Sequence, residues 1–290
     1  MIFRRVSNKF VLAVLAILFG FNLLLWVQVG RENSGFLKVV FFDVGQGDAI
    51  LVETPKGTQI LIDGGPSSAI VGKLGQELPF FDRSIDLVLS THPDSDHLAG
   101  LVDVLKSYDV VSFGWSGVKS SSAESQELDR QMEVNEIKRV VLARGTRISV
   151  GKNLSLLVLA PLESFEGREV KDYNTSSLVL KMNYGQECFL FTGDAPVSVE
   201  KKLALAEDSL VCRVLKVGHH GSKTSTSELF LEKAEPRVAV IQVGKDNKYG
   251  HPSPEVLERL QNHGIKVLRT DQAGDIRIFS DGQNLFTKPN

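Results

Sequence analysis

The chain has 290 residues, of which 42% are hydrophobic and 23% are charged, and this composition excludes a disordered, collagen-like or coiled-coil protein. Its net charge of −2 excludes a general binder of polyanions. The two cysteines, Cys188 and Cys212, are too few and too far apart for a disulfide scaffold or a thiolate zinc finger. Both fall in apolar strand-like runs, so we expect buried free thiols, although neighbouring strands would be able to bring them together.

Residues 10–29 form an apolar run with only two polar interruptions. About 20 helical residues cross a hydrocarbon core of about 30 Å, so the run predicts a single-pass membrane anchor. A cleaved signal peptide is the alternative. Basic residues precede the run, which predicts a cytoplasmic segment 1–9, a linker 30–36 and an extracytoplasmic domain 37–290 held at the cell membrane.

The rest of the chain alternates strand-like and helix-like patterns. Strands are predicted at residues 37–44, 49–53, 58–63, 85–90, 139–142, 154–159, 177–184, 188–192, 210–217, 238–243, 266–269 and 275–279. Helices are predicted at residues 98–108, 122–136, 197–206, 227–234 and 254–263. Two halves of similar make-up favour an α/β fold in which two sheets pack face to face with helices outside.

The strongest signal for chemistry lies directly after the predicted strand 85–90. Four potential metal ligands fall there within six residues, namely His92, Asp94, Asp96 and His97. On a loop that leads from a strand to a helix, alternate residues point into one cleft, and His97 joins them as the helix opens. Imidazole and carboxylate together suit Zn, Mn or Fe. A polar turn with capping aspartates is the alternative, but a helix cap needs one acceptor and not four ligands.

Further candidates follow predicted strands. Asp194 ends an apolar strand, where its carboxylate would bridge two metal ions or, alternatively, cap the helix 197–206. His219 and His220 point in opposite directions if the chain is extended, so we expect one ligand, His219, with His220 facing the substrate. Asp63, at another strand end, is expected to orient the loop that carries the histidine–aspartate motif.

The H-x-D-x-D-H pattern resembles the H-x-H-x-D-H motif of the metallo-β-lactamase superfamily. Asp94 in place of a histidine is typical of the branch that includes the hydrolase domain of ComEC, a DNA-uptake channel protein. Segments that resemble other motifs of this branch are 42–49, 62–65, 191–194, 218–222 and 250–252. The resemblance covers most of residues 37–260. It implies a four-layer αββα sandwich, here preceded by one transmembrane helix, that holds two divalent metal ions, Zn or Mn.

The resemblance also assigns roles to single residues. The expected metal ligands are His92, Asp94, Asp96, His97, Asp194 and His219. The expected catalytic residues are Asp96, His220 and His251, the last as a proton donor to the leaving group. The expected substrate contacts are Gln46, Asn174, Ser222 and Lys223, and the residues expected to lie behind the ligands and orient them are Asp43, Asp48 and Asp63.

Together these features predict a membrane-anchored hydrolase, a phosphodiesterase or nuclease in which a metal-bridging hydroxide attacks the phosphodiester. Without residues 1–36 the chain carries 29 basic and 34 acidic residues, so a nucleic-acid substrate requires metal ions or a local basic patch. One apolar span cannot form a channel, so a separately encoded channel protein is an expected partner. The alternatives are hydrolysis of lactams, lactones or choline-phosphate esters, and metal binding without activity.

Overall fold

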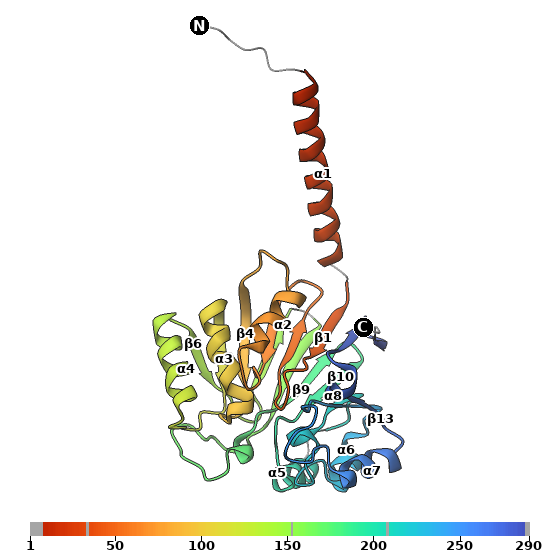
Figure 1. Ribbon diagram of the computed structural model, residues 1–290. Coiled ribbons are helices and arrows are strands. Elements are labelled where there is room, and N and C mark those ends of the chain that lie inside the picture. Colours follow the sequence, from red (N-terminus) through yellow and green to blue (C-terminus); the bar gives the residue numbers. More distant parts are fainter. Residues whose placement is uncertain (1–7, 33–34, 152, 207–208, 288–290) are drawn as a thin grey trace.

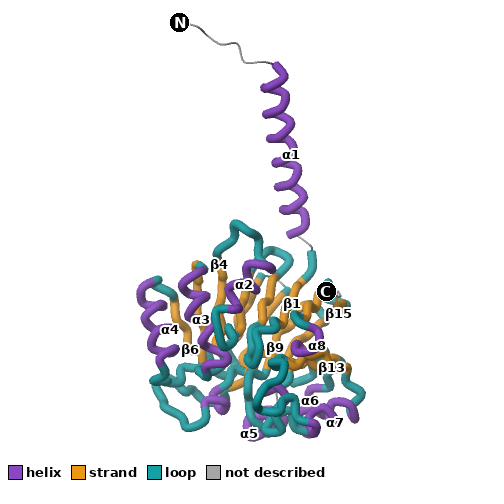
Figure 2. The backbone as a smooth tube through the Cα atoms, in the orientation of Figure 1, coloured by secondary structure: helices purple, strands orange, loops and turns teal. Residues whose placement is uncertain are grey.

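The computed structural model describes residues 8–32, 35–151, 153–206 and 209–287, without the side chains of residues 25–32. Two β-sheets pack together (Figures 1 and 2). The first has the order β15-β14-β1-β2-β3-β4-β5-β6, with β1 Leu37–Phe41, β2 Ile50–Glu53, β3 Gln59–Ile62, β4 Ser84–Ser90, β5 Asp109–Trp115, β6 Lys138–Val141, β14 Ile276–Ser280 and β15 Leu285–Thr287. From β3 to β6 the strands run parallel, and the other pairs are antiparallel.

The second sheet has the order β13-β12-β11-β10-β9-β8-β7, with β7 Arg147–Val150, β8 Leu154–Ala160, β9 Val179–Tyr184, β10 Glu187–Phe191, β11 Val214–Lys216, β12 Val238–Ile241 and β13 Lys266–Arg269. The larger helices that accompany the sheets are α2 Ala69–Glu77, α3 Ser95–Ser107, α4 Ala123–Val134, α5 Val197–Ala204, α6 Glu228–Ala234 and α7 Pro254–Asn262. The short α8, Thr270–Ala273, links the second sheet back to the first.

Three apolar layers hold these elements together, as a four-layer sandwich requires. Helices α2, α3 and α4 share one core with the outer face of the first sheet, and α5, α6 and α7 share another with the second sheet. The third core lies between the sheets. Strand β1 illustrates the pattern, because Val39 and Phe41 face the other sheet while Val40 faces the helices. The α/β sandwich that the sequence predicts is therefore confirmed.

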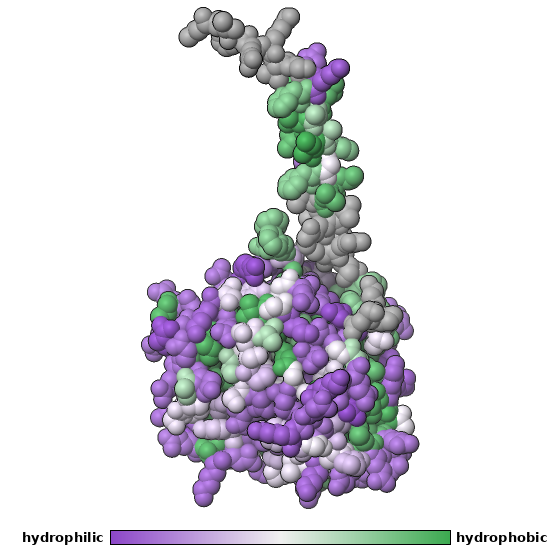
Figure 3. All heavy atoms as spheres, viewed as in Figure 1, coloured by the Kyte–Doolittle hydropathy of each residue, from purple (hydrophilic) through white to green (hydrophobic). Residues whose placement is uncertain are grey.

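Helix α1, Asn8–Glu32, covers the predicted anchor 10–29 and projects away from the domain (Figure 1). All the large apolar side chains described on it, from Phe10 to Leu24, are exposed and form an apolar column (Figure 3). Among the described residues, no helix combines the length and the apolarity needed to cross a membrane. Parts of the predicted segments 1–9 and 30–36 lie outside the described residues.

Several elements are absent from the prediction. Helix α2 contains Gly72 and Gly75, which weaken a helical pattern. Strand β5 directly follows the predicted helix 98–108, and strand β7 is a half-exposed edge strand with little apolar character. In each case tertiary packing, and not the local pattern, fixes the element.

The expectation of free thiols is wrong, because Cys188 and Cys212 form a disulfide with their Cα atoms 4.8 Å apart. Strands β10 and β11 are parallel neighbours that pair Phe189 with Val214. Cys188 directly precedes Phe189 and Cys212 lies two residues before Val214, so the parallel pairing brings both cysteines to the same end of neighbouring strands, which is the proximity that a disulfide needs.

The tight contact between α3 and the loop after β3 gives a test of the fold. A Cβ atom at Gly100 would lie 2.0 Å from the carbonyl oxygen of Gly64 and 2.7 Å from that of Ser67. Backbone atoms cannot step aside cheaply, so Gly100→Ala should lower the free energy of unfolding by about 1–3 kcal/mol. A Cβ atom at Gly72 meets nothing within 4 Å, so Gly72→Ala should raise it by about 0.5–1 kcal/mol. Urea denaturation of both variants measures the difference, and equal midpoints would contradict the assigned contact.

Candidate metal centre

The loop that follows β4 is held by the carboxylate of Asp63. This residue follows β3, the parallel neighbour of β4, with a left-handed φ of 57°. Its Oδ1 accepts a hydrogen bond from the Thr91 backbone N–H at 2.8 Å, and its Oδ2 accepts one from Thr91 Oγ1 at 2.7 Å. Oδ2 also lies 2.9 Å from His97 Nδ1. A carboxylate bound to one ring nitrogen directs the other toward a metal, which is the geometry predicted for Asp63 as an orienting residue.

The two histidines of the motif present free ring nitrogens to the interior. His92 Nδ1 lies 2.9 Å from Thr91 Oγ1, and the two histidine ring centroids are 4.1 Å apart. The Nε2 atoms of His92 and His97 are buried and have no hydrogen-bond partner among the described residues. Asp94 begins α3, but its side chain makes no capping hydrogen bond, and its Oδ2 lies 3.3 Å from His92 Nε2. The alternative of capping aspartates therefore does not describe this carboxylate.

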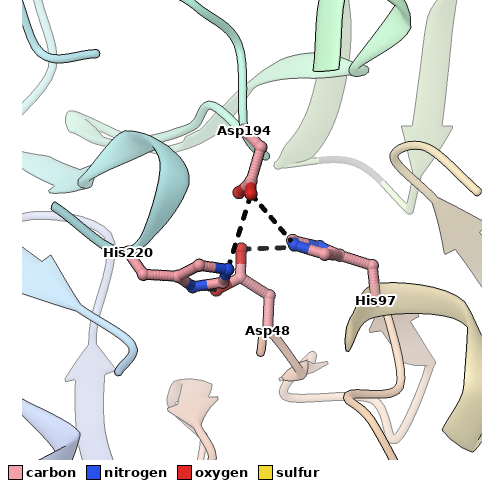
Figure 4. Close-up of side chains that lie close together, drawn as sticks. All are labelled: Asp48, His97, Asp194 and His220. Carbon is pink, nitrogen blue, oxygen red and sulfur yellow. Dashed lines mark ion pairs between the residues drawn. The ribbon is translucent and has the colours of Figure 1, made fainter. Parts of the chain in front are cut away.

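Four buried side chains, His97 among them, converge at one point (Figure 4). They are Asp48 from the β1–β2 loop, His97 from α3, Asp194 from the loop after β10 and His220 from the turn after β11. One potential ligand atom from each lies within 4.8 Å of all the others. Asp194 Oδ2 is central, at 3.3 Å from His97 Nε2 and 3.4 Å from His220 Nε2. Loops from both sheets thus bring imidazole and carboxylate groups to one point.

The adjacent histidines are not extended, contrary to the assumption behind their predicted roles. His219 and His220 have left-handed φ values of 48° and 53° in the turn Gly218–Gly221. His220 is 1% exposed, with Nε2 3.2 Å from Asp96 Oδ2, whereas His219 Nε2 lies 3.9 Å from Asp194 Oδ2. The geometry therefore favours His220 as the ligand and leaves His219 at the half-exposed rim, which corrects the predicted assignment.

Lys216 is a functional candidate that the sequence reasoning missed. Its ammonium group is buried at the end of β11, where it forms an ion pair with Asp48, lies 2.9 Å from the Gly193 carbonyl oxygen and lies 3.5 Å from Asp194 Oδ1. A lysine inside an apolar strand run was the available signal, because lysine is almost never fully buried unless paired. Asp48, predicted to stand behind the ligands, lies within the cluster itself.

Opposing effects set the protonation states of this cluster. Burial lowers the pKa of His97, but the carboxylates of Asp194 and Asp48 outweigh it and raise that pKa well above its usual range. The same opposition raises the pKa of His220 to about 9. Burial raises the pKa of Asp194, yet the positive charges of His97 and His220 hold it well below its usual range. The site stabilises positive charge, and a divalent cation that binds there must displace protons from the imidazoles.

Asp96 adds a partly exposed carboxylate to the cluster. Burial raises its pKa, but the hydrogen bond to His220 and the charge of His97 lower it to about 2. It is therefore ionised at neutral pH. The site is a buried set of imidazole and carboxylate donors, and the Nε2 atoms of His92 and His97 have no hydrogen-bond partner among the described residues. Such a set fits a borderline or hard divalent ion such as Zn or Mn.

The predicted substrate residues are arranged unevenly. Asn174 lies in the short helix Tyr173–Ser176 with a buried Oδ1 that has no partner among the described residues. Gln46 Oε1 accepts a hydrogen bond from the Gly244 N–H at 3.1 Å, which ties two loops together. Ser222 is buried, and Lys223 is exposed. The structure thus gives Gln46 a bracing contact, and the substrate role of all four residues stays a prediction.

Two other predicted residues lie at the margin. Asp43 Oδ1 accepts a hydrogen bond from the Gly45 N–H at 3.3 Å, and this contact shapes the β1–β2 turn. The ring of His251 lies 5.8 Å from that of His219. Burial and then the neighbouring His219 lower the pKa of His251. This keeps its imidazole neutral at pH 7, which suits a proton acceptor better than the predicted donor.

Comparisons with known proteins now identify the family. The family model for the metallo-beta-lactamase superfamily matches residues 42–245. The chain belongs to this superfamily. ComE operon protein 3 of Bacillus subtilis (strain 168) is 33% identical over 276 residues, which cover 88% of this chain and 34% of the relative. Competence protein ComA of Neisseria gonorrhoeae is 31% identical over 248 residues, which cover 85% of this chain and 32% of the relative.

Solved structures of metallo-β-lactamase proteins share the fold. The structure of Igni18, a novel metallo hydrolase from Ignicoccus hospitalis KIN4/I, superposes with a TM-score of 0.53 at 14% identity and covers 83% of this chain and 98% of its own. This chain spans about a third of the length of its curated relatives. The chain therefore has the metallo-β-lactamase fold, is related to competence proteins and carries a potential metal site at Asp48, His97, Asp194 and His220.

Removing the charge of Asp63 should weaken metal binding without removing a ligand. Asp63→Asn loses the carboxylate that orients His97 and the His92 loop, so the affinity for Zn or Mn should fall by about 10- to 100-fold. Asp103→Asn, on the same helix as His97, is the matched control and should bind as the wild type does. Titration against a competing chelator measures both affinities. Equal affinities for the two variants would contradict an orienting role for Asp63.

Proposed function

We propose that this protein is a metal-dependent phosphodiesterase that cleaves nucleic acid. The observation that carries the proposal is the convergence of buried imidazole and carboxylate groups around Asp194, without a thiolate, beside the second histidine–aspartate pair of His92 and Asp94. Such a donor set suits hydrolysis at phosphorus. The relatives named for competence and the ComE operon support a nucleic-acid substrate.

Each residue has a task in this reaction. Asp48, His97, Asp194 and His220, with Asp96 beside them, would hold one ion, and His92 and Asp94 would hold a second. Bound divalent ions lower the pKa of water and offset the charge of a phosphate. Asp63 and Thr91 keep the two motif histidines aimed inward, and Lys216 keeps Asp194 in place through Gly193.

Protons leave through the rim of the site. His219 is half-exposed, and burial, followed by the charges around it, lowers its pKa. Its ring lies between those of His220 and His251, at 6.0 Å and 5.8 Å. The neutral imidazoles of His219 and His251 would accept a proton from the site and pass it to solvent. The half-exposed site of His219 fits this task because a carrier needs contact with both the cluster and solvent.

Hydrolysis assays with the full-length protein test the proposal. Single-stranded DNA and bis-p-nitrophenyl phosphate should turn over with added Mn or Zn, and Asp194→Ala should reduce the rate by at least about 100-fold because it removes the central ligand. Asp103→Asn should keep the wild-type rate. If the protein hydrolysed a lactam, a lactone or a choline-phosphate ester and left both phosphodiester substrates uncleaved, the proposed substrate class would be wrong. Bound metal without any turnover would favour an inactive metal-binding module.

We also propose that helix α1 anchors the protein in the cell membrane, with residues 10–29 in the bilayer and the hydrolase domain outside the cytoplasm. Exposed apolar side chains along α1 support this location. Phe80 and Phe81 support it as well, because they are 71% and 79% exposed in the loop before β4. Strand β4 starts at the same end of the first sheet as β1, so this loop and the connection to α1 share one end of the domain. A separately encoded channel protein remains the proposed partner.

Flotation on a density gradient tests the anchor. The full chain should float with phospholipid vesicles, whereas Leu15→Glu combined with Leu18→Glu should stay at the bottom, because charged groups are costly in the hydrocarbon core. Lys56→Glu alone changes the net charge by the same −2 and should float. Sedimentation of the wild type away from vesicles would overturn the anchor. Protection of the domain from external protease in intact cells would overturn its proposed side of the membrane.

A further inference from the structure

A pocket of about 80 Å³ opens beside the metal centre on the side of the first sheet. His92 and Pro93, from the loop that carries the metal motif, form one of its walls. Strand β5 ends next to β4 in parallel register, with Trp115 opposite Ser90, so the pocket lies one strand away from the loop of His92. A group bound in the pocket would therefore lie next to a substrate held at the metal centre. None of the residues assigned to substrate contact lines this pocket.

The interior of the pocket is mainly apolar and contains an aromatic ring. Leu98 from α3, Phe113 from β5 and Leu128 from α4 are buried side chains that line it. Trp115 is half-buried at the end of β5 and also lines it. The guanidinium carbon of Arg139 lies 4.4 Å from the centroid of the Trp115 ring. This cation–π contact fixes the indole as a flat surface at low entropic cost.

Positive charge borders this apolar interior. Lys119 lines the pocket, is exposed and forms no ion pair within the described part of the chain. Arg139 lines it too, but its Nη2 lies 3.0 Å from Oδ1 of Asp129, a carboxylate that also lines the pocket, so the net positive charge there comes from Lys119. An aromatic surface with adjacent cations is the combination that binds a single nucleic-acid strand, because the ring stacks on a base while the cations neutralise phosphates. The same cations disfavour a choline headgroup, which is itself positive.

We propose that this pocket receives a nucleobase of the substrate strand, from the nucleotide next to the phosphodiester held at the metal centre. The proposal rests on the proposed nuclease function and names the part of the substrate that the enzyme recognises. Size sets the base class. An enclosed cavity that holds benzene measures about 150 Å³. A pocket of about 80 Å³ that is open to solvent takes part of one six-membered ring and not a fused pair, so pyrimidines are preferred over purines.

Trp115 makes the proposal directly measurable. The chain has two tryptophans, so Trp26→Phe leaves Trp115 as the sole indole fluorophore. In that background, with metal present and a phosphorothioate backbone to prevent turnover, titration with oligothymidylate should quench the fluorescence of Trp115. Oligodeoxyadenylate and an abasic strand of equal length should bind about tenfold more weakly or worse, since they lose the stacking contact in the pocket. Equal quenching by the abasic strand and by oligothymidylate would overturn the proposal.

Substitutions separate stacking from charge. With a labelled strand and anisotropy as the readout, Trp115→Ala should abolish the preference for thymidylate over the abasic strand, and Trp115→Phe should retain it because a ring remains. Lys119→Ala should weaken all strands alike and reduce the salt dependence by about one phosphate contact. Urea denaturation checks that each variant folds. If folded Trp115→Ala kept the preference for thymidylate over the abasic strand, the pocket would not be the base site.

The two proposals fail in different ways. Base-dependent quenching of Trp115 without hydrolysis of any phosphodiester would support the pocket and contradict the nuclease function. Hydrolysis of thymidylate, adenylate and abasic substrates at equal kcat/KM would support the nuclease and contradict the pocket. Hydrolysis that favours pyrimidine strands in the wild type and loses this preference in Trp115→Ala is the expected outcome.

Discussion

The ion pair between the two sheets, with Lys216 at its centre, is the constraint on which the site depends. Lys216 belongs to the second sheet, and its ammonium group pairs with Asp48 from the first and approaches Asp194 from the second. Burying an unpaired charge costs several kcal/mol, so these groups stabilise the sandwich only when they meet. The same contacts fix the carboxylate that His97 and His220 surround. The same contacts therefore determine both the packing of the two sheets and the geometry of the metal centre.

Local motifs were readable from the sequence because their residues are neighbours on one loop. Four ligands between His92 and His97 need only a strand end and a helix start to converge, and both elements form where the pattern predicts them. The two sheets were readable for a similar reason, since near-continuous apolar runs indicate strands covered on both faces. The roles of His219 and His220 were not, because a left-handed turn reverses the argument from extended backbone.

Features that depend on contacts between distant elements escaped the sequence. The pairing of Cys188 with Cys212 follows from the parallel register of β10 and β11, which no local pattern encodes. Lys216 resembles a chance polar residue in an apolar run until Asp48 is placed opposite it. Strand β5 was absent from the prediction, so its final residue, Trp115, had no place beside His92. The pocket therefore escaped the sequence analysis because strand β5, which supplies Trp115, was not predicted.

Charge links metal binding to the proposed substrate. The cluster around Asp194 sets the ionised carboxylates of Asp96 and Asp194 against Lys216 and the protonated imidazoles of His97 and His220, and residues 37–290 carry a net charge of −5. The imidazoles lose their protons when a divalent ion binds, so a nucleic-acid strand at this site would depend on the ion to offset repulsion. Lys216 cannot serve this purpose for the strand, because its ammonium group is buried and committed to Asp48. Lys119 and Arg139 lie outside the cluster, so in the proposed nuclease they would attract phosphates without competing for the metal ligands. A change at Lys119 would therefore alter strand affinity and leave metal affinity intact, whereas loss of the metal would weaken both.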